Sequence, residues 1–119
     1  MKDSIGTILV DFDGTLATYT EWKGIDHTGE PIPKMVDRVK EWLYNGKNVK
    51  IFTARVSPNQ KQETIDLATK TIQDWCQKYI GQVLEVTAFK DFDVIEIWDD
   101  RAIPVIKNTG KINNGIIER

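Results

Sequence analysis

The chain has 119 residues, of which 40% are hydrophobic and 29% charged. This composition is typical of one folded domain and argues against a disordered chain. A net charge of -2 argues against a broad electrostatic grip on nucleic acid. No apolar run reaches membrane-spanning length, no signal peptide is visible, and Cys76 is the only cysteine, so we expect a cytoplasmic protein with no membrane partner.

The first half of the chain predicts a strand, a flap, a helix and a second strand. The apolar run at residues 7–12 predicts a buried strand. Residues 17–33 are rich in turn residues and predict a flap over the end of that strand, formed as a loose hairpin. Trp22 in this flap either contacts substrate or packs on the domain's own surface. Apolar residues at helical spacing predict a helix at residues 34–44, and a second strand follows at residues 48–53.

A second helix and two further strands are expected in the second half. The dipeptide Ser57-Pro58 is typical of a helix start, because serine caps a helix and proline fits its first turn. An apolar stripe at helical spacing runs from residue 65 to residue 79 and includes Cys76, which we interpret as a core residue. Two strands are expected at residues 83–87 and 94–98.

The chain after the fourth strand carries weaker signals. Residues 101–107 allow a short helix that Pro104 interrupts, residues 108–115 predict a turn-rich loop, and Ile116-Ile117 predict a short edge strand. Strands that alternate with helical segments indicate an α/β fold. We expect one domain over residues 1–119, built as a Rossmann-like parallel sheet with helices on both faces.

Polar residues follow the predicted strands where each one ends. Asp11 and Asp13 are two residues apart, so an extended chain would direct both into one pocket. Ligands of open α/β sheets bind beyond the carboxyl ends of the strands. Clustered carboxylates repel one another unless a cation lies between them. Mg²⁺ suits one or two carboxylates beside a phosphate. The candidate residues at these ends are Asp11, Asp13, Thr53, Ala54, Arg55, Asp99, Asp100 and Arg101, and Lys90 lies just before the fourth strand.

Such a set of residues suits phosphoryl transfer. One carboxylate can attack phosphorus, and a second can protonate the leaving oxygen and then deprotonate water. A hydroxyl, backbone N–H groups and a lysine can hold the remaining phosphoryl oxygens. Arg55 and Arg101 either contact the phosphate or form ion pairs with the acidic cluster.

The segment Asp11-Phe12-Asp13-Gly14-Thr15-Leu16 resembles the first motif of the haloacid dehalogenase (HAD) superfamily of phosphohydrolases. Thr53 resembles the second motif, Lys90 the third and Asp99-Asp100 the fourth, all in the family's order. An alternative is that Lys90 is an ordinary surface lysine, because it lies close before Asp99.

The resemblance implies roles for the matching positions. Asp11 would be the nucleophile and Asp13 the general acid and base. Mg²⁺ would be held by the carboxylates of Asp11 and Asp99, by the backbone carbonyl of Asp13, and by Asp100 either directly or through water. The phosphoryl group would be bound by Thr53, Ala54, Lys90 and Gly14.

The spaces between the motifs are too short for the cap domain that many HAD enzymes carry, so the resemblance implies a small capless phosphatase with an open site. Only the flap or a partner subunit in a homo-oligomer would cover it. The expected function is Mg²⁺-dependent hydrolysis of a small phosphorylated metabolite, a sugar phosphate or a nucleotide. Short likenesses to capsule-biosynthesis phosphatases and to the 3′-phosphatase domain of phage-type polynucleotide kinases leave a nucleic-acid end open as substrate. Phosphotransfer to an alcohol, a receiver-like signalling module and a non-catalytic binding domain are further alternatives.

Overall fold

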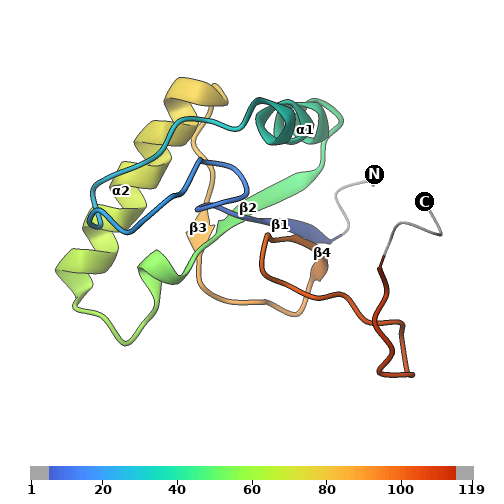
Figure 1. Ribbon diagram of the computed structural model, residues 1–119. Coiled ribbons are helices and arrows are strands. Elements are labelled where there is room, and N and C mark those ends of the chain that lie inside the picture. The colour runs from blue at the N-terminus through green and yellow to red at the C-terminus, as the bar shows by residue number, and fades with distance from the viewer. Residues whose placement is uncertain (1–5, 115–119) are drawn as a thin grey trace.

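The computed structural model describes residues 6–114. Four parallel strands form one sheet in the order β3-β2-β1-β4 (Figure 1). This arrangement confirms the expected α/β class with a Rossmann-like parallel sheet. The elements are β1 (Thr7–Asp11), α1 (Pro33–Tyr44), β2 (Asn48–Phe52), the 3₁₀ helix η1 (Ala54–Val56), α2 (Gln62–Tyr79), β3 (Val86–Thr87) and β4 (Val94–Trp98).

Both helices pack on one face of the sheet (Figure 1). Side chains alternate along a strand, so Ile8 and Val10 of β1 point to the same side. The paired residues of β2, Val49 and Ile51, point there too. These four residues share one buried cluster with side chains of both helices, which include Met35, Val36, Val39, Ile72, Trp75 and Cys76.

The other face differs from the expectation that helices cover both faces. Among the described residues, this face carries the connection from β3 to β4, residues 88–93, which is too short for a helix. The connection must cross the sheet because β3 and β4 lie at its two edges. It contacts this face where Thr7 Oγ1 donates to Asp93 Oδ2 at 2.8 Å and where Lys50 Nζ lies 3.8 Å from Asp91 Oδ2. Leu9, on the same face, is only 1% exposed.

The predicted start of the second helix is wrong, because α2 begins at Gln62. Ser57 Oγ instead donates to the carbonyl oxygen of Ala54 at 2.8 Å, which closes the turn of η1. Gln60 Nε2 donates to the carbonyl oxygen of Arg55 at 2.8 Å. Both polar side chains therefore shape the loop after β2 and cap no helix.

The end of the described chain forms a hairpin and not the predicted helix at residues 101–107. Val105 and Ile112 form an antiparallel bridge, and Ile106 N donates to Lys111 O at 2.8 Å. The turn between them uses positive φ angles, 66° at Asn108 and 76° at Gly110, which these two residue types tolerate best. The predicted strand at Ile116-Ile117 lies outside the described residues.

Cys76 is confirmed as a core residue. Its side chain is fully buried against the sheet. Burial raises the pKa of the thiol to about 12, so the thiol stays protonated and unreactive at neutral pH. Within residues 6–114, neither helix combines the length and the apolar character that crossing a bilayer requires.

Replacement of a central core side chain tests this packing. Ile51 lies in β2 and is fully buried between the sheet and the helices. We expect Ile51→Ala to lower the free energy of unfolding by about 2–5 kcal/mol, because it leaves a cavity. Tyr44→Ala, at an exposed position of α1, should change it by no more than about 0.5 kcal/mol. Urea denaturation followed by circular dichroism compares the two, and equal losses would contradict the assigned core.

Candidate active site

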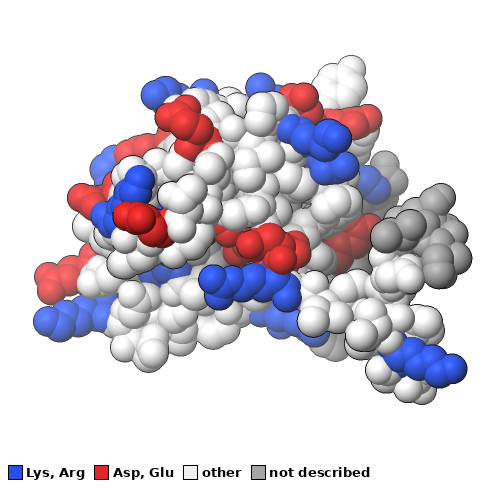
Figure 2. Space-filling model, in the orientation of Figure 1, with Lys and Arg blue, Asp and Glu red and all other residues white. Residues whose placement is uncertain are grey.

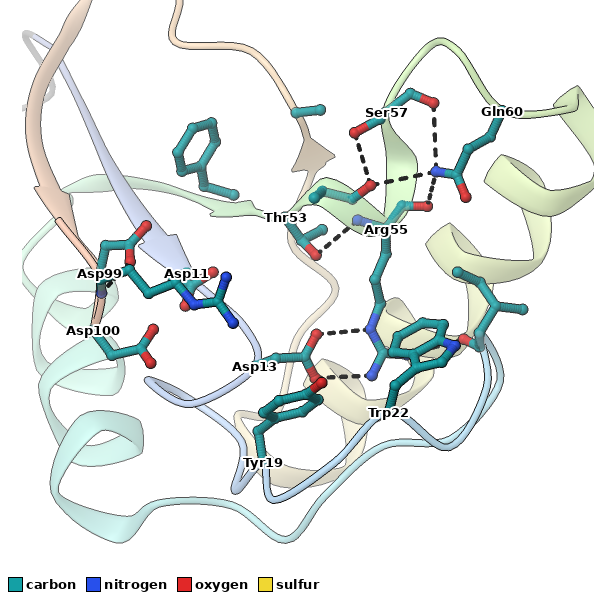
Figure 3. A pocket seen from close by; sticks show the side chains of 15 residues that line it. Asp11, Asp13, Tyr19, Trp22, Thr53, Arg55, Ser57, Gln60, Asp99 and Asp100 are labelled. Atoms are coloured by element: carbon teal, nitrogen blue, oxygen red, sulfur yellow. Dashed lines mark hydrogen bonds and ion pairs between the residues drawn. The ribbon is translucent and has the colours of Figure 1, made fainter.

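Three carboxylates meet at the carboxyl edge of the sheet. Asp11 ends β1, and Asp99 and Asp100 directly follow β4, the strand that pairs with β1. One oxygen from each side chain lies within 4.8 Å of the others (Figure 3). The parallel pairing of β1 and β4 therefore brings together residues that are almost ninety positions apart in the sequence.

The loop after β1 fits closely around these carboxylates. Thr15 Oγ1 donates to Asp11 Oδ2 at 3.1 Å and lies 3.4 Å from Asp100 Oδ1. Gly14 has a φ of 89°, and a Cβ at that position would come within 2.7 Å of Asp100 Oδ2. Glycine is therefore required here both for the turn and for the space that the carboxylate occupies.

The cluster is electrostatically unfavourable without a cation. Burial raises the pKa of Asp11 to about 7, and the hydrogen bond to Asp100 and the negative charge of Asp99 add to the effect. Near neutral pH, the metal-free protein therefore holds a proton on Asp11 in a large fraction of molecules.

The side chain of Asp13 points away from this cluster. Both of its carboxylate oxygens accept hydrogen bonds from Arg55, from Nε and from Nη2, each at 2.8 Å (Figure 3). The Arg55 guanidinium is almost fully buried, and this bidentate pair compensates its charge. The three carboxylates expected to hold a metal, those of Asp11, Asp99 and Asp100, cluster, whereas the Asp13 carboxylate forms an ion pair.

Arg55 also holds the flap at residues 17–33. Its Nη1 donates to the carbonyl oxygen of Ile25 at 3.0 Å, and its guanidinium carbon lies 4.9 Å from the centre of the Trp22 ring. Trp22 therefore packs on the domain through Arg55 and at the same time lines the cavity of the site. The flap has the loose hairpin form expected, with one antiparallel bridge between Ala17 and Pro31.

A cavity of about 490 Å³ opens over the carboxylates. In Figure 2, acidic and basic side chains gather at the centre of the face shown. Thr53 is buried and its Oγ1 accepts a hydrogen bond from Arg55 N at 3.2 Å, so its hydroxyl hydrogen remains able to bond a ligand. The predicted residues that line the cavity are Asp11, Asp13, Trp22, Thr53, Ala54, Arg55, Asp99, Asp100 and Arg101.

Lys90 does not line this cavity. It is exposed on the connection from β3 to β4, and Ala88 is the residue of that connection that reaches the cavity wall. Arg101 is the cation that lines the cavity and has no ion pair among the described residues. The charge of Arg101 is therefore available to an anionic ligand in the cavity.

The sequence did not predict six of the residues that line the cavity, which are Tyr19, Ile25, Phe52, Ser57, Gln60 and Ala88. Phe52 could have been predicted as a lining residue, because it directly precedes Thr53 at the end of the same strand. No such signal marks Ser57 and Gln60, because the same pattern also predicts a helix start.

Comparisons with known proteins support the fold and indicate no activity. No family model matches the chain, and no curated protein matches it. A solved structure of a conserved protein coded by a locus from Bacteroides thetaiotaomicron is similar, with a TM-score of 0.54 over 94% of this chain and 85% of that chain. The two sequences are 24% identical, so the likeness supports the α/β fold alone.

The raised pKa of Asp11 predicts how stability depends on pH. Between about pH 4 and pH 7, the folded metal-free protein binds more protons at Asp11 than the unfolded chain does. This residue therefore makes the folded state less stable as the pH rises through that range. Asp11→Asn removes this titration. From pH 5 to pH 8, the free energy of unfolding of the variant should therefore rise relative to that of the wild type. Urea denaturation in EDTA measures the difference, with Asp37→Asn on α1 as the control. A difference that stays constant with pH would contradict the assignment.

The ion pair of Arg55 predicts a coupling between stability and the flap. Arg55→Ala leaves Asp13 without its partner and should lower the free energy of unfolding by about 2–4 kcal/mol. The flap should also detach, because its bond to Ile25 and its contact to Trp22 are lost. Trypsin cleavage after the exposed Lys23, followed by mass spectrometry under native conditions, should then become faster.

Arg38→Ala is the matched control, because Arg38 packs over Trp98 and touches no flap residue that the structure describes. If this variant and Arg55→Ala accelerate cleavage after Lys23 equally, Arg55 does not hold the flap.

Proposed function

We propose that the chain is a Mg²⁺-dependent phosphomonoesterase of the HAD superfamily that acts on a small phosphorylated metabolite. The observation that carries this proposal is the cluster of Asp11, Asp99 and Asp100, which shares one cavity with the Thr53 hydroxyl and the Arg101 guanidinium. Carboxylates on one side and donors on the other suit a cation and a phosphate bound together.

The donor set fits Mg²⁺. This ion prefers oxygen ligands at about 2.0–2.1 Å, so two of its ligands lie no more than about 4.2 Å apart. The three carboxylate oxygens lie within 4.8 Å of one another, and small side-chain rotations would bring them to that distance. Bound Mg²⁺ would neutralise the cluster and polarise the phosphate.

Asp11 is the carboxylate suited to attack phosphorus. Asp11 is the last residue of the buried strand β1, and Thr15 Oγ1 donates to one of its carboxylate oxygens at 3.1 Å. In the first step an Asp11 oxygen forms a bond to phosphorus while the bond from phosphorus to the leaving oxygen breaks. In the second step water attacks the same phosphorus, inorganic phosphate leaves, and Asp11 is regenerated.

Asp13 is the group proposed to give a proton to the leaving oxygen and to take one from water. In the substrate-free protein both of its oxygens are engaged by Arg55. Because Arg55 engages both oxygens, Asp13 must turn from Arg55 toward the leaving oxygen to exchange a proton with it. The substrate phosphate also attracts Arg55, so it can replace Asp13 as the partner of the guanidinium and release the carboxylate.

Two further observations support this function over its alternatives. The strand order β3-β2-β1-β4 differs from the 2-1-3-4-5 order of receiver modules, in which the first strand lies beside the third. The cavity of about 490 Å³ has the size that encloses a small ligand.

Phosphate release from a panel of phosphomonoesters tests the proposal. The panel contains sugar phosphates, nucleotides and 3′-phosphorylated oligonucleotides, each with Mg²⁺ and with EDTA. We expect release that needs Mg²⁺ and that falls at least about 10³-fold in Asp11→Asn, because this variant keeps the shape and loses the nucleophile. Asp37→Asn on α1 should retain full activity.

Release that persists in Asp11→Asn would contradict the covalent route. If no compound of the panel releases phosphate while Mg²⁺ binds, the non-catalytic alternative is favoured.

A further inference from the structure

Exposed apolar side chains concentrate near the end of the described chain. Of thirteen large apolar side chains that are exposed among residues 6–114, eight lie between residues 89 and 112. They form two groups. The first, which we call the bare face, consists of Phe89, Phe92, Ile95 and Ile97; the second, on the hairpin arm at residues 103–112, consists of Ile103, Val105, Ile106 and Ile112.

The hairpin arm projects from the domain (Figure 1). All of its residues from 103 to 112 are exposed. A two-stranded hairpin is marginally stable by itself in water, so an arm of this kind needs a surface to pack against. Figure 2 shows the arm as largely uncharged, with basic side chains toward its tip.

The bare face lies on the side of the sheet that has no helix. Leu9 of β1 pairs with Ile97 of β4, so both point away from the helices, and Ile95 does so too. Phe89 and Phe92 extend outward from the connection that crosses the same side. Both faces of a parallel sheet are normally covered, whereas these four side chains are between 37% and 106% exposed.

We infer that the hairpin arm of one chain docks on the bare face of a second copy, and that the two copies exchange arms in a symmetric dimer. A second copy brings both surfaces, so one twofold axis buries each arm and each bare face. This inference does not depend on the proposed enzymatic function.

Charge supports this choice of partner. Three acidic residues, Glu85, Asp91 and Asp93, and two lysines, Lys50 and Lys90, lie beside the bare face, whereas residues 101–112 contain three basic residues and no acidic one. Net charges of opposite sign therefore surround the two apolar groups, which favours contact between arm and face over contact between two arms.

The size of the two surfaces is also adequate. The exchange would bury eight large exposed apolar side chains of each copy, four on the arm and four on the bare face. Docking would also fix the position of Arg101, which lines the cavity immediately before the arm begins.

Sedimentation velocity of the full chain at several concentrations tests the inference. We expect a mass of about twice 13.6 kDa. Val105→Asp on the arm and Ile97→Asp on the bare face should each weaken the dimer at least about tenfold. Tyr44→Asp, an exposed position on α1, should leave the dimer unchanged, and circular dichroism shows that each variant is folded.

Disulfide trapping distinguishes a second copy from the chain's own arm. Cys76 is buried and does not compete, so Phe92→Cys and Ile106→Cys can be introduced into separate chains, one of them isotopically labelled. We expect a disulfide between labelled and unlabelled chains. A monomeric mass at every concentration, a dimer that both aspartate variants leave intact, or a disulfide formed only within a chain carrying both cysteines would overturn the inference.

Discussion

The repulsion among three carboxylates at one edge of the sheet is the constraint on which the site depends. Parallel pairing of β1 with β4 places Asp11 beside Asp99 and Asp100, and no lysine or arginine among residues 6–114 forms an ion pair with them. Burial, together with the neighbouring Asp100 and Asp99, raises the pKa of Asp11 to about 7, so the metal-free protein relieves the repulsion by holding a proton there. The same relief is available from a divalent cation, which is why we connect the cluster with Mg²⁺ and with phosphate chemistry.

A second electrostatic unit lies across the cavity, and it links the flap to the site. Arg55 bonds both oxygens of Asp13, the carbonyl oxygen of Ile25 and the face of Trp22. One buried cation thus connects the loop after β1, the loop after β2 and the flap. In the proposed reaction, the release of Asp13 from Arg55 would therefore be coupled to flap position, so substrate binding and proton transfer would depend on the same ion pair.

Much of the sheet and half of the site follow from local sequence. The apolar runs predict β1, β2 and β4 within a residue or two, because short segments rich in valine and isoleucine are typical of strands. The direction of Asp13 could not be predicted, because alternation holds only within a strand and β1 ends at Asp11. The start of α2 was missed because Ser57 bonds the preceding turn. The sheet has helices on one face only, because the connection from β3 to β4 at residues 88–93 crosses the other face and is too short for a helix. Its length is visible in the sequence, but its path depends on the strand order, which is not.

The most direct test of this account is the binding of Mg²⁺ to the wild type and to Asp99→Asn, measured by calorimetry at pH 7 in two buffers of different ionisation enthalpy. The account predicts one ion per chain, the release of a fraction of a proton because Asp11 must ionise, and a large loss of affinity in the variant. Binding that is absent, or that is equally strong in Asp99→Asn, would contradict the claim that these carboxylates form a cation site.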